Sequence, residues 1–281
     1  MDFWSHTVEV QGLRIRYLRA GSAGPPLLML HGGGTDSALL SWGSAIGPLS
    51  QHNQVYAPDW PGYGESQRPN VRYSLAYYIK FLEDLMPALN LERANLVGVS
   101  MGGGVALGFT LDSPRMVDKL VLVDSYGLAS TAPSHRLSYL FIKTPLINEL
   151  TWMVLGRSRV AAKAALQNIF HNPDAVSEAL VDEVVAELRK PGAGKSFISF
   201  QKNEVGWRGL RTVFTDRLDE ITAPTLTIHG AEDRLVPLEA ARQAHRRIPN
   251  SQLHVMEGCG HWPQREQPET FNRIVSSFLN C

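Results

Sequence analysis

Short runs of aliphatic residues recur along the chain, and a glycine or a polar residue ends each of them. Such a run is typical of a strand that is buried on both faces of a sheet. Longer stretches with helical spacing lie between most of the runs, which predicts parallel strands joined by helices. The predicted buried strands are residues 27–30, 55–57, 95–99, 120–123, 226–228 and 253–256.

Residues 7–10 and 13–17 differ, because apolar and polar side chains alternate along both segments. This alternation predicts an antiparallel hairpin at the edge of the sheet with one face in solvent. Together these patterns predict an α/β fold with a mostly parallel, doubly wound sheet of about eight strands. Helical spacing predicts helices over residues 74–89, directly after Ser100, over 240–247 and over 268–279.

The rhythm of strands stops between residues 126 and 218, where the sequence has only helical patterns. Strands of the same series flank this stretch, so we expect residues 1–125 and 219–281 to form one core. Residues 126–218 are then a helical cap (a lid) inserted over the carboxyl ends of the strands. An independent second domain is the alternative. The predicted helices of the insertion are residues 138–155, 159–170, 175–188 and 195–206.

The composition excludes several functional classes. Basic and acidic residues balance at 27 each, so the chain has no general attraction for nucleic acid. Two cysteines do not make a disulfide framework, which favours a reducing compartment. The sequence has neither a signal-peptide pattern nor a long apolar span. We therefore expect a cytoplasmic protein with no membrane partner, while its oligomeric state remains open.

The strongest local motif is Gly98-Val99-Ser100-Met101-Gly102, between an aliphatic run and a helical pattern. A sharp turn from strand to helix strains its central residue, and small neighbours two positions away relieve the crowding. The turn exposes the serine hydroxyl beside the free N–H groups of the first helical turn. Ser100 is therefore predicted to be a nucleophile, with an ordinary helix N-cap as the alternative.

Two further motifs accompany this turn. His31-Gly32-Gly33-Gly34 follows a predicted strand, and Asp59-Trp60-Pro61-Gly62-Tyr63-Gly64-Glu65-Ser66 follows the next one. With the serine motif, they resemble the α/β-hydrolase superfamily over essentially the whole chain. The resemblance implies an oxyanion loop at the first motif. It also implies an acid and a histidine after later strands, in the order serine, aspartate, histidine.

Asp233 and His261 occupy the two places that the resemblance implies. His261 is expected to take the proton of Ser100 during attack and to return it to the leaving group. Asp233 is expected to hold the imidazole tautomer and to stabilise the imidazolium. The backbone N–H groups of Met101 and of Gly33 or Gly34 are expected to bind the oxyanion. This chemistry requires neither a cofactor nor a metal.

Other polar residues compete for these roles. Asp124 is the rival acid, since it also follows a strand. The histidines have no spacing typical of a metal site. Structural roles are expected for the remaining candidates, which are Glu232, His31, Asp59 and Cys259.

Residues around the serine and the histidine also resemble the meta-cleavage-product hydrolases, which cleave carbon–carbon bonds of aromatic ring-fission products. Ser100-Met101-Gly102-Gly103 and the run from Gly258 to Gln264 carry this resemblance. Val99 departs from it, because that group usually has an asparagine there. The group also uses a cap arginine to bind a carboxylate. In this chain Asp182 and Glu183 lie near that place, with Arg189 as the nearest basic residue, and an acidic pair would repel an anionic substrate.

We therefore expect a cap-bearing hydrolase of carboxylic esters that acts on a small, fairly apolar molecule. A carbon–carbon bond hydrolase is the close alternative, and a noncatalytic receptor on the same fold is a third. Trp42 and Trp262 are predicted to line the substrate pocket, whereas core packing is favoured for Phe170. A dehalogenase or an epoxide hydrolase of this fold would carry aspartate in place of Ser100.

Overall fold

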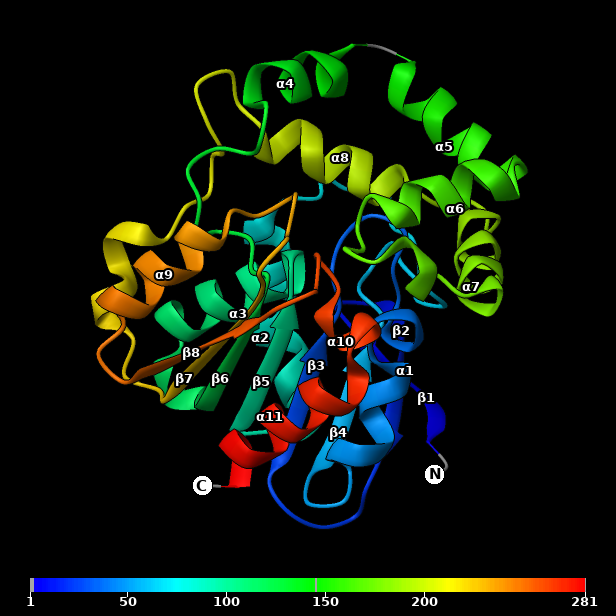
Figure 1. The fold of residues 1–281 in the computed structure, drawn as a ribbon. Coiled ribbons are helices and arrows are strands. Elements are labelled where there is room, and N and C mark those ends of the chain that lie inside the picture. The colour runs from blue at the N-terminus through cyan, green and yellow to red at the C-terminus, as the bar shows by residue number, and fades with distance from the viewer. Residues whose placement is uncertain (1–2, 145, 281) are drawn as a thin grey trace.

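The computed structural model describes residues 3–144 and 146–280. Its centre is an eight-stranded sheet with the strand order β1-β2-β4-β3-β5-β6-β7-β8 (Figure 1). Pairing is antiparallel between β1 and β2 and between β2 and β4, and parallel elsewhere. The strands are β1 (Trp4–Val10), β2 (Leu13–Ala20), β3 (Pro26–Leu30), β4 (Gln54–Pro58), β5 (Ala94–Val99), β6 (Val117–Val123), β7 (Thr225–Gly230) and β8 (Ser251–Met256).

The structure confirms the predicted α/β fold and its sheet of eight strands. Strands β3 to β7 are almost fully buried, as their continuous aliphatic runs require. Strand β8 was also predicted to be buried, and this was wrong. It is the last strand of the sheet, so exposed and partly buried residues alternate along it.

Helices cover both faces of the sheet (Figure 1). Helices α2, α3 and α9 pack on one face and α1 and α11 on the other, which produces two apolar cores. Helix α1 follows the glycines after β3 and was not predicted. The helices that flank the sheet are α1 (Ala38–Leu49), α2 (Leu75–Ala88), α3 (Met101–Asp112), α9 (Leu238–Arg247), α10 (Pro263–Glu266) and α11 (Pro268–Asn280). Two 3₁₀ turns, Pro114–Met116 and Thr215–Glu220, accompany them.

Five helices between β6 and β7 form a separate layer above the carboxyl ends of the strands (Figure 1). The prediction of one helix over residues 138–155 was wrong, because two helices occupy this stretch. The sequence has Pro145 between them, and proline in the interior of a helix removes a backbone hydrogen bond and clashes with the preceding turn. These inserted helices are α4 (His135–Lys143), α5 (Ile147–Arg157), α6 (Arg159–Gln167), α7 (Glu178–Leu188) and α8 (Lys195–Glu204), with a 3₁₀ turn at Pro173–Ala175.

Within residues 3–144 and 146–280, no helix combines the length and the hydropathy that crossing a bilayer requires.

Candidate active site

Ser100 lies at the sharp junction of β5 and α3, with φ 51° and ψ −118°. Residues other than glycine rarely adopt a positive φ, so this backbone is strained. The Ser100 N–H donates to the Val123 carbonyl at 2.9 Å, which fixes the junction to β6. A Cβ at Gly98 would lie 2.4 Å from the Gly102 oxygen, and one at Gly102 would lie 2.2 Å from the Leu30 oxygen. The turn therefore requires glycine at both positions.

His261 and Asp233 are brought together from the ends of β8 and β7. His261 Nδ1 lies 2.8 Å from Asp233 Oδ2, and the backbone N–H groups of Leu235 and Val236 donate to Oδ1 at 2.7 and 3.2 Å. Burial opposes ionisation of Asp233. The charge and hydrogen bond of His261 outweigh it, and they hold the pKa of this carboxyl below its ordinary value. Asp233 is therefore an anion that orients the imidazole.

Ser100 and His261 line the same two cavities, so the nucleophile and the base predicted from sequence share one site. Among the hydrogen bonds of the described residues, none joins the Ser100 hydroxyl to His261. Hydrogen bonds of this kind often tighten only when substrate is bound.

Asp124, the rival acid, does not contact His261 but lies behind Asp233. Its Oδ1 accepts the Gly230 N–H at 3.0 Å and lies 3.4 Å from Nδ1 of His229. Burial and the charge of Asp233 raise the pKa of Asp124 well above its ordinary value, while burial lowers the pKa of His229. Both shifts favour the uncharged forms, a protonated carboxyl beside a neutral imidazole.

Asp124, His229 and Asp233 also present their ligand atoms within 4.8 Å of one another, as a metal site would. The oxygens of Asp233 are already occupied by His261 and by two backbone N–H groups. The raised pKa of Asp124 further reduces the negative charge of the cluster. The donor set therefore suits a proton better than a divalent cation.

The glycines after β3 form a wall of the site. Gly32, Gly33 and Gly34 line the same cavity as Ser100. A Cβ at Gly33 would lie 2.7 Å from the Phe197 ring and 3.5 Å from the Met101 sulfur. In the described part of the chain, the backbone N–H groups of Gly33, Gly34 and Met101 donate no hydrogen bond, which leaves all three available to an anion.

A buried carboxyl that was not predicted holds this loop. Asp36 accepts hydrogen bonds from the N–H groups of Gly32 and Ser37, both at 2.8 Å, and from the Ser41 hydroxyl. Burial raises the pKa of Asp36 to about 7. Because Asp36 is fully enclosed, its three donors fix the path of the glycine loop beside Ser100.

Two cavities of about 340 and 250 Å³ meet at Ser100 and His261. Phe197 of α8 and Leu235 line both of them, so these two side chains stand at the division between the cavities. The walls of the smaller cavity include Trp152, Leu155, Ala162, Ala165, Leu166, Ile169, Val184, Leu188 and Trp262. The larger cavity includes Tyr126, Ile142, Phe200, Gln201, Glu204, Leu210, Arg234 and Val236.

The two tryptophans predicted to line the pocket have different environments. Trp262 lies on the smaller cavity and makes an edge contact with Phe170, which is a core residue as expected. The prediction for Trp42 was wrong. Its side chain is fully buried in α1 and packs against Phe271 on the sheet side of that helix. An aromatic residue close in sequence to the glycine loop is thus part of the core.

The acidic pair of α7 does not lie in the pocket, so the expected repulsion of an anionic substrate was wrong. Asp182 is exposed and pairs with Arg159, and Glu183 is exposed and pairs with Arg265 at 3.1 Å. Arg189 is also exposed, and its guanidinium donates to a backbone carbonyl. The helix turns its valines and leucines to the interior instead.

The other competing residues have structural contacts. His31 Nε2 accepts the Trp60 N–H at 3.1 Å, and burial lowers the pKa of this imidazole to about 4. Asp59 accepts the backbone N–H of Glu65 across its own turn and that of Ala38 at the start of α1. Glu232 accepts the Cys259 N–H, and burial raises the pKa of the Cys259 thiol to about 12.

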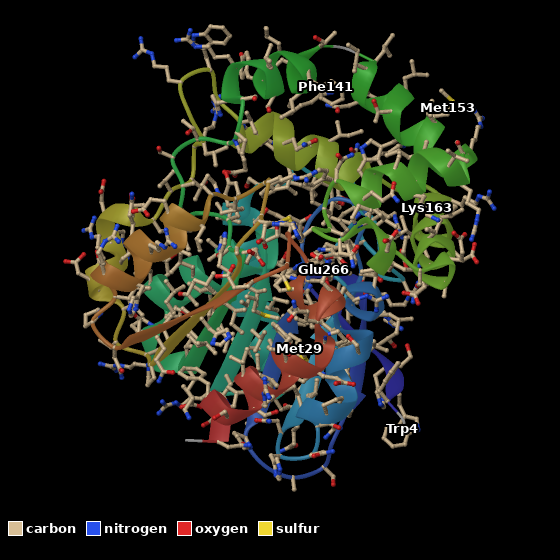
Figure 2. All side chains as sticks on the ribbon, in the orientation of Figure 1. Trp4, Met29, Phe141, Met153, Lys163 and Glu266 are labelled. Atoms are coloured by element: carbon tan, nitrogen blue, oxygen red, sulfur yellow. The ribbon has the colours of Figure 1, made fainter. Side chains whose placement is uncertain are left out.

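The loop that carries His261 is also hydrogen-bonded to the inserted segment, at the connection that follows α6, which sequence reasoning missed. The His261 N–H donates to the Ile169 carbonyl at 2.8 Å. The Glu266 carboxylate accepts the N–H groups of Gly260 at 2.6 Å and His171 at 2.9 Å. Glu266 lies at the centre of the molecule, where the core meets the inserted layer (Figure 2).

Comparisons with known proteins agree with this architecture. The α/β hydrolase fold family matches residues 25–268. The chain therefore belongs to that family and is an enzyme of the α/β hydrolase superfamily.

Its relatives include a 2-hydroxy-6-oxo-2,4-heptadienoate hydrolase of Pseudomonas putida. That enzyme is 32% identical over 92% of this chain and 90% of its own length. An uncharacterised protein of Mycobacterium tuberculosis is 33% identical over 96% of this chain and 80% of its own. The meta-cleavage product hydrolase of Pseudomonas fluorescens IP01 superposes with a TM-score of 0.84. It is 29% identical, covering 98% of this chain and 97% of that structure. The resemblance to meta-cleavage-product hydrolases noted in the sequence is thus confirmed.

Proposed function

We propose that the chain is a serine hydrolase that cleaves carboxylic esters with an apolar acyl group. In this mechanism Ser100 attacks the ester carbonyl while His261 removes its proton, and Asp233 stabilises the imidazolium. The N–H groups of Met101 and of Gly33 or Gly34 hold the oxyanion. His261 then protonates the leaving alcohol, and water hydrolyses the acyl-enzyme by the same route. Residues 126–218 act as the cap that encloses the acyl group.

The lining of the smaller cavity carries this proposal. Among the described residues on its wall, no side chain is lysine, arginine, asparagine or glutamine, and Thr35 is the only hydroxyl besides Ser100. Away from the glycine loop and His261, a carboxylate placed there would lose its hydration without gaining a charged partner, which is costly. An aliphatic or aromatic acyl group is stabilised by the same walls. Val99, fully buried before the nucleophile, adds another apolar side chain beside the serine turn.

The named relatives support a second candidate, which is hydrolysis of a carbon–carbon bond in a ring-fission product. Such a substrate carries a carboxylate. In the described lining of the larger cavity, Arg234 is the arginine that could pair with this carboxylate. The buried Glu204 lines the same cavity. The negative charge of Glu204 repels a bound anion and offsets the attraction of Arg234. This cavity is therefore a weaker anion site than one with arginine alone.

The two candidates can be separated with purified protein. Its turnover of p-nitrophenyl acetate, butyrate and octanoate is measured beside the bleaching of a yellow dienolate ring-fission product. Labelling of Ser100 by a fluorophosphonate is followed in parallel. We expect labelling and ester turnover, and Ser100→Ala should abolish both.

Efficient bleaching of the dienolate with poor ester turnover would replace the first candidate by the second. If labelling and turnover were both absent, the noncatalytic receptor would be favoured instead.

A further inference from the structure

Exposed apolar side chains are concentrated on one part of the surface. Of the fourteen large hydrophobic residues that are exposed in the described chain, nine lie between residues 137 and 160. Three of them, Leu137, Leu146 and Val160, have at least 70% of their surface in solvent. We name this set the outer patch. It consists of Leu137, Leu140, Phe141, Leu146, Ile147, Leu150, Met153, Val154 and Val160.

The outer patch lies on the exposed sides of α4 and α5, with Leu146 just before α5 and Val160 at the start of α6. Phe141 and Met153 lie in the inserted helical layer, while Trp4 lies at the opposite end of the molecule (Figure 2). The other sides of the same helices line the cavities, through Ile142 for the larger cavity and Trp152 for the smaller one. Two short helices thus separate the cavities from an apolar surface. A clustered patch of this kind marks a binding surface.

Unpaired cations border the patch at its α4 end. Residues 135–160 contain four basic residues and one acidic residue, Glu149, which pairs with Lys202 of α8. In the described structure neither Arg136 nor Lys143 is paired with a carboxylate. Their side chains lie near the Trp207 and Tyr139 rings. The Lys143 ammonium donates to the backbone carbonyl of Lys202, which brings α8 beside α4. Burial lowers the pKa of Lys143, and the nearby charges of Arg211, Lys202 and Arg72 lower it further.

We propose that the outer patch binds the surface of anionic lipid membranes. Apolar side chains flanked by cations match the boundary between acyl chains and anionic headgroups. A second copy of the chain is a poorer partner. In a twofold dimer the same surface meets itself, which would place the cations of both copies close together. The proposal departs from the expectation of no membrane partner, which rested on the sequence having neither a signal-peptide pattern nor a long apolar span and so did not address peripheral binding. It is also independent of the substrate.

Co-sedimentation with lipid vesicles tests the proposal. The full chain is mixed with vesicles of phosphatidylcholine alone or with added phosphatidylglycerol. We expect binding to the anionic vesicles that weakens as salt is added. The double variant Leu140→Asp with Met153→Asp should bind at least about tenfold more weakly, since each change replaces an exposed apolar side chain that would enter the bilayer surface. Trp4→Asp is the matched control on the far end and should bind as the unchanged protein does.

A second variant tests the cations without altering the apolar surface. Arg136→Gln with Arg211→Gln should weaken binding to anionic vesicles about fivefold for each charge and leave phosphatidylcholine binding unchanged. Fluorophosphonate labelling and circular dichroism check that every variant is folded.

The proposal is overturned if the unchanged protein does not sediment with anionic vesicles. It is also overturned if the double aspartate variant binds equally well. A dimer in sedimentation equilibrium that this variant dissociates, without vesicle binding, would assign the patch to contact between copies instead.

Discussion

Replacing Asp233 with asparagine tests the proposed mechanism most directly, because the surroundings of this carboxyl dictate how the amide must lie. The N–H groups of Leu235 and Val236 both donate to Oδ1, so the amide oxygen of an asparagine takes that position. The amide NH₂ then faces His261 Nδ1, where Oδ2 now lies at 2.8 Å. The imidazole must accept there, and its proton moves to Nε2, the nitrogen that has to receive the Ser100 proton.

The expected loss is about 10⁴-fold in kcat, which corresponds to about 5 kcal/mol in the activation barrier. The assay is turnover of p-nitrophenyl butyrate over a range of pH, with KM measured alongside. We expect KM to change little, because Asp233 does not line either cavity. Circular dichroism and urea unfolding establish that the variant is folded.

Asp124→Asn is the matched control, since it makes the same change in a neighbouring buried acid. The raised pKa of Asp124 favours its uncharged carboxyl, which an asparagine amide matches in charge and shape, so we expect the change to alter little. We expect a loss of less than about tenfold in kcat, or about 1.4 kcal/mol. A variant of Asp233 that keeps more than a tenth of the activity, or an equal loss in both variants, would refute this account of the acid.

Three further predictions concern the turn, the cavities and the pH dependence of stability. Gly102→Ala should lower the free energy of unfolding by at least about 2 kcal/mol in urea titrations, since its Cβ would meet the Leu30 carbonyl; unchanged stability would contradict this. Phe197→Ala should join the two cavities and raise the preference for octanoate over acetate esters about tenfold in kcat/KM, and an unaltered preference would argue against it. Because burial lowers the pKa of His31 from 6.5 to about 4, its contribution to stability is complete above pH 6.5. About 3 kcal/mol should be lost as the pH falls to 4, and His31→Gln should not show this slope.

The sequence was most informative where one local pattern determines the structure. Aliphatic runs bounded by glycine placed the strands, and the strained turn at Ser100 followed from the glycines around it. The α7 helix shows a signal that was available but not used. Its apolar spacing at Val181, Val184, Val185 and Leu188 already directs Asp182 and Glu183 away from the interior.

Other features could not be read from the sequence because they depend on contacts between distant segments. Helix α1 determines the direction of the Trp42 side chain. Because this helix was not predicted, Trp42 was wrongly assigned to the pocket. Glu266 bonds to His171, which is 95 positions away, and no local pattern indicates this. Glu204 likewise accepts the Leu75 N–H at the start of α2, which joins α8 to the core.

The hydrogen bond from the His261 N–H to the Ile169 carbonyl has a consequence for how the enzyme distinguishes substrates. The backbone of the proposed base is held by the same inserted segment whose side chains line the smaller cavity. An acyl group that displaces Ile169 also displaces the imidazole relative to Ser100. Poorly fitting substrates should therefore lose turnover as well as affinity, so discrimination is expressed in kcat and not in KM alone.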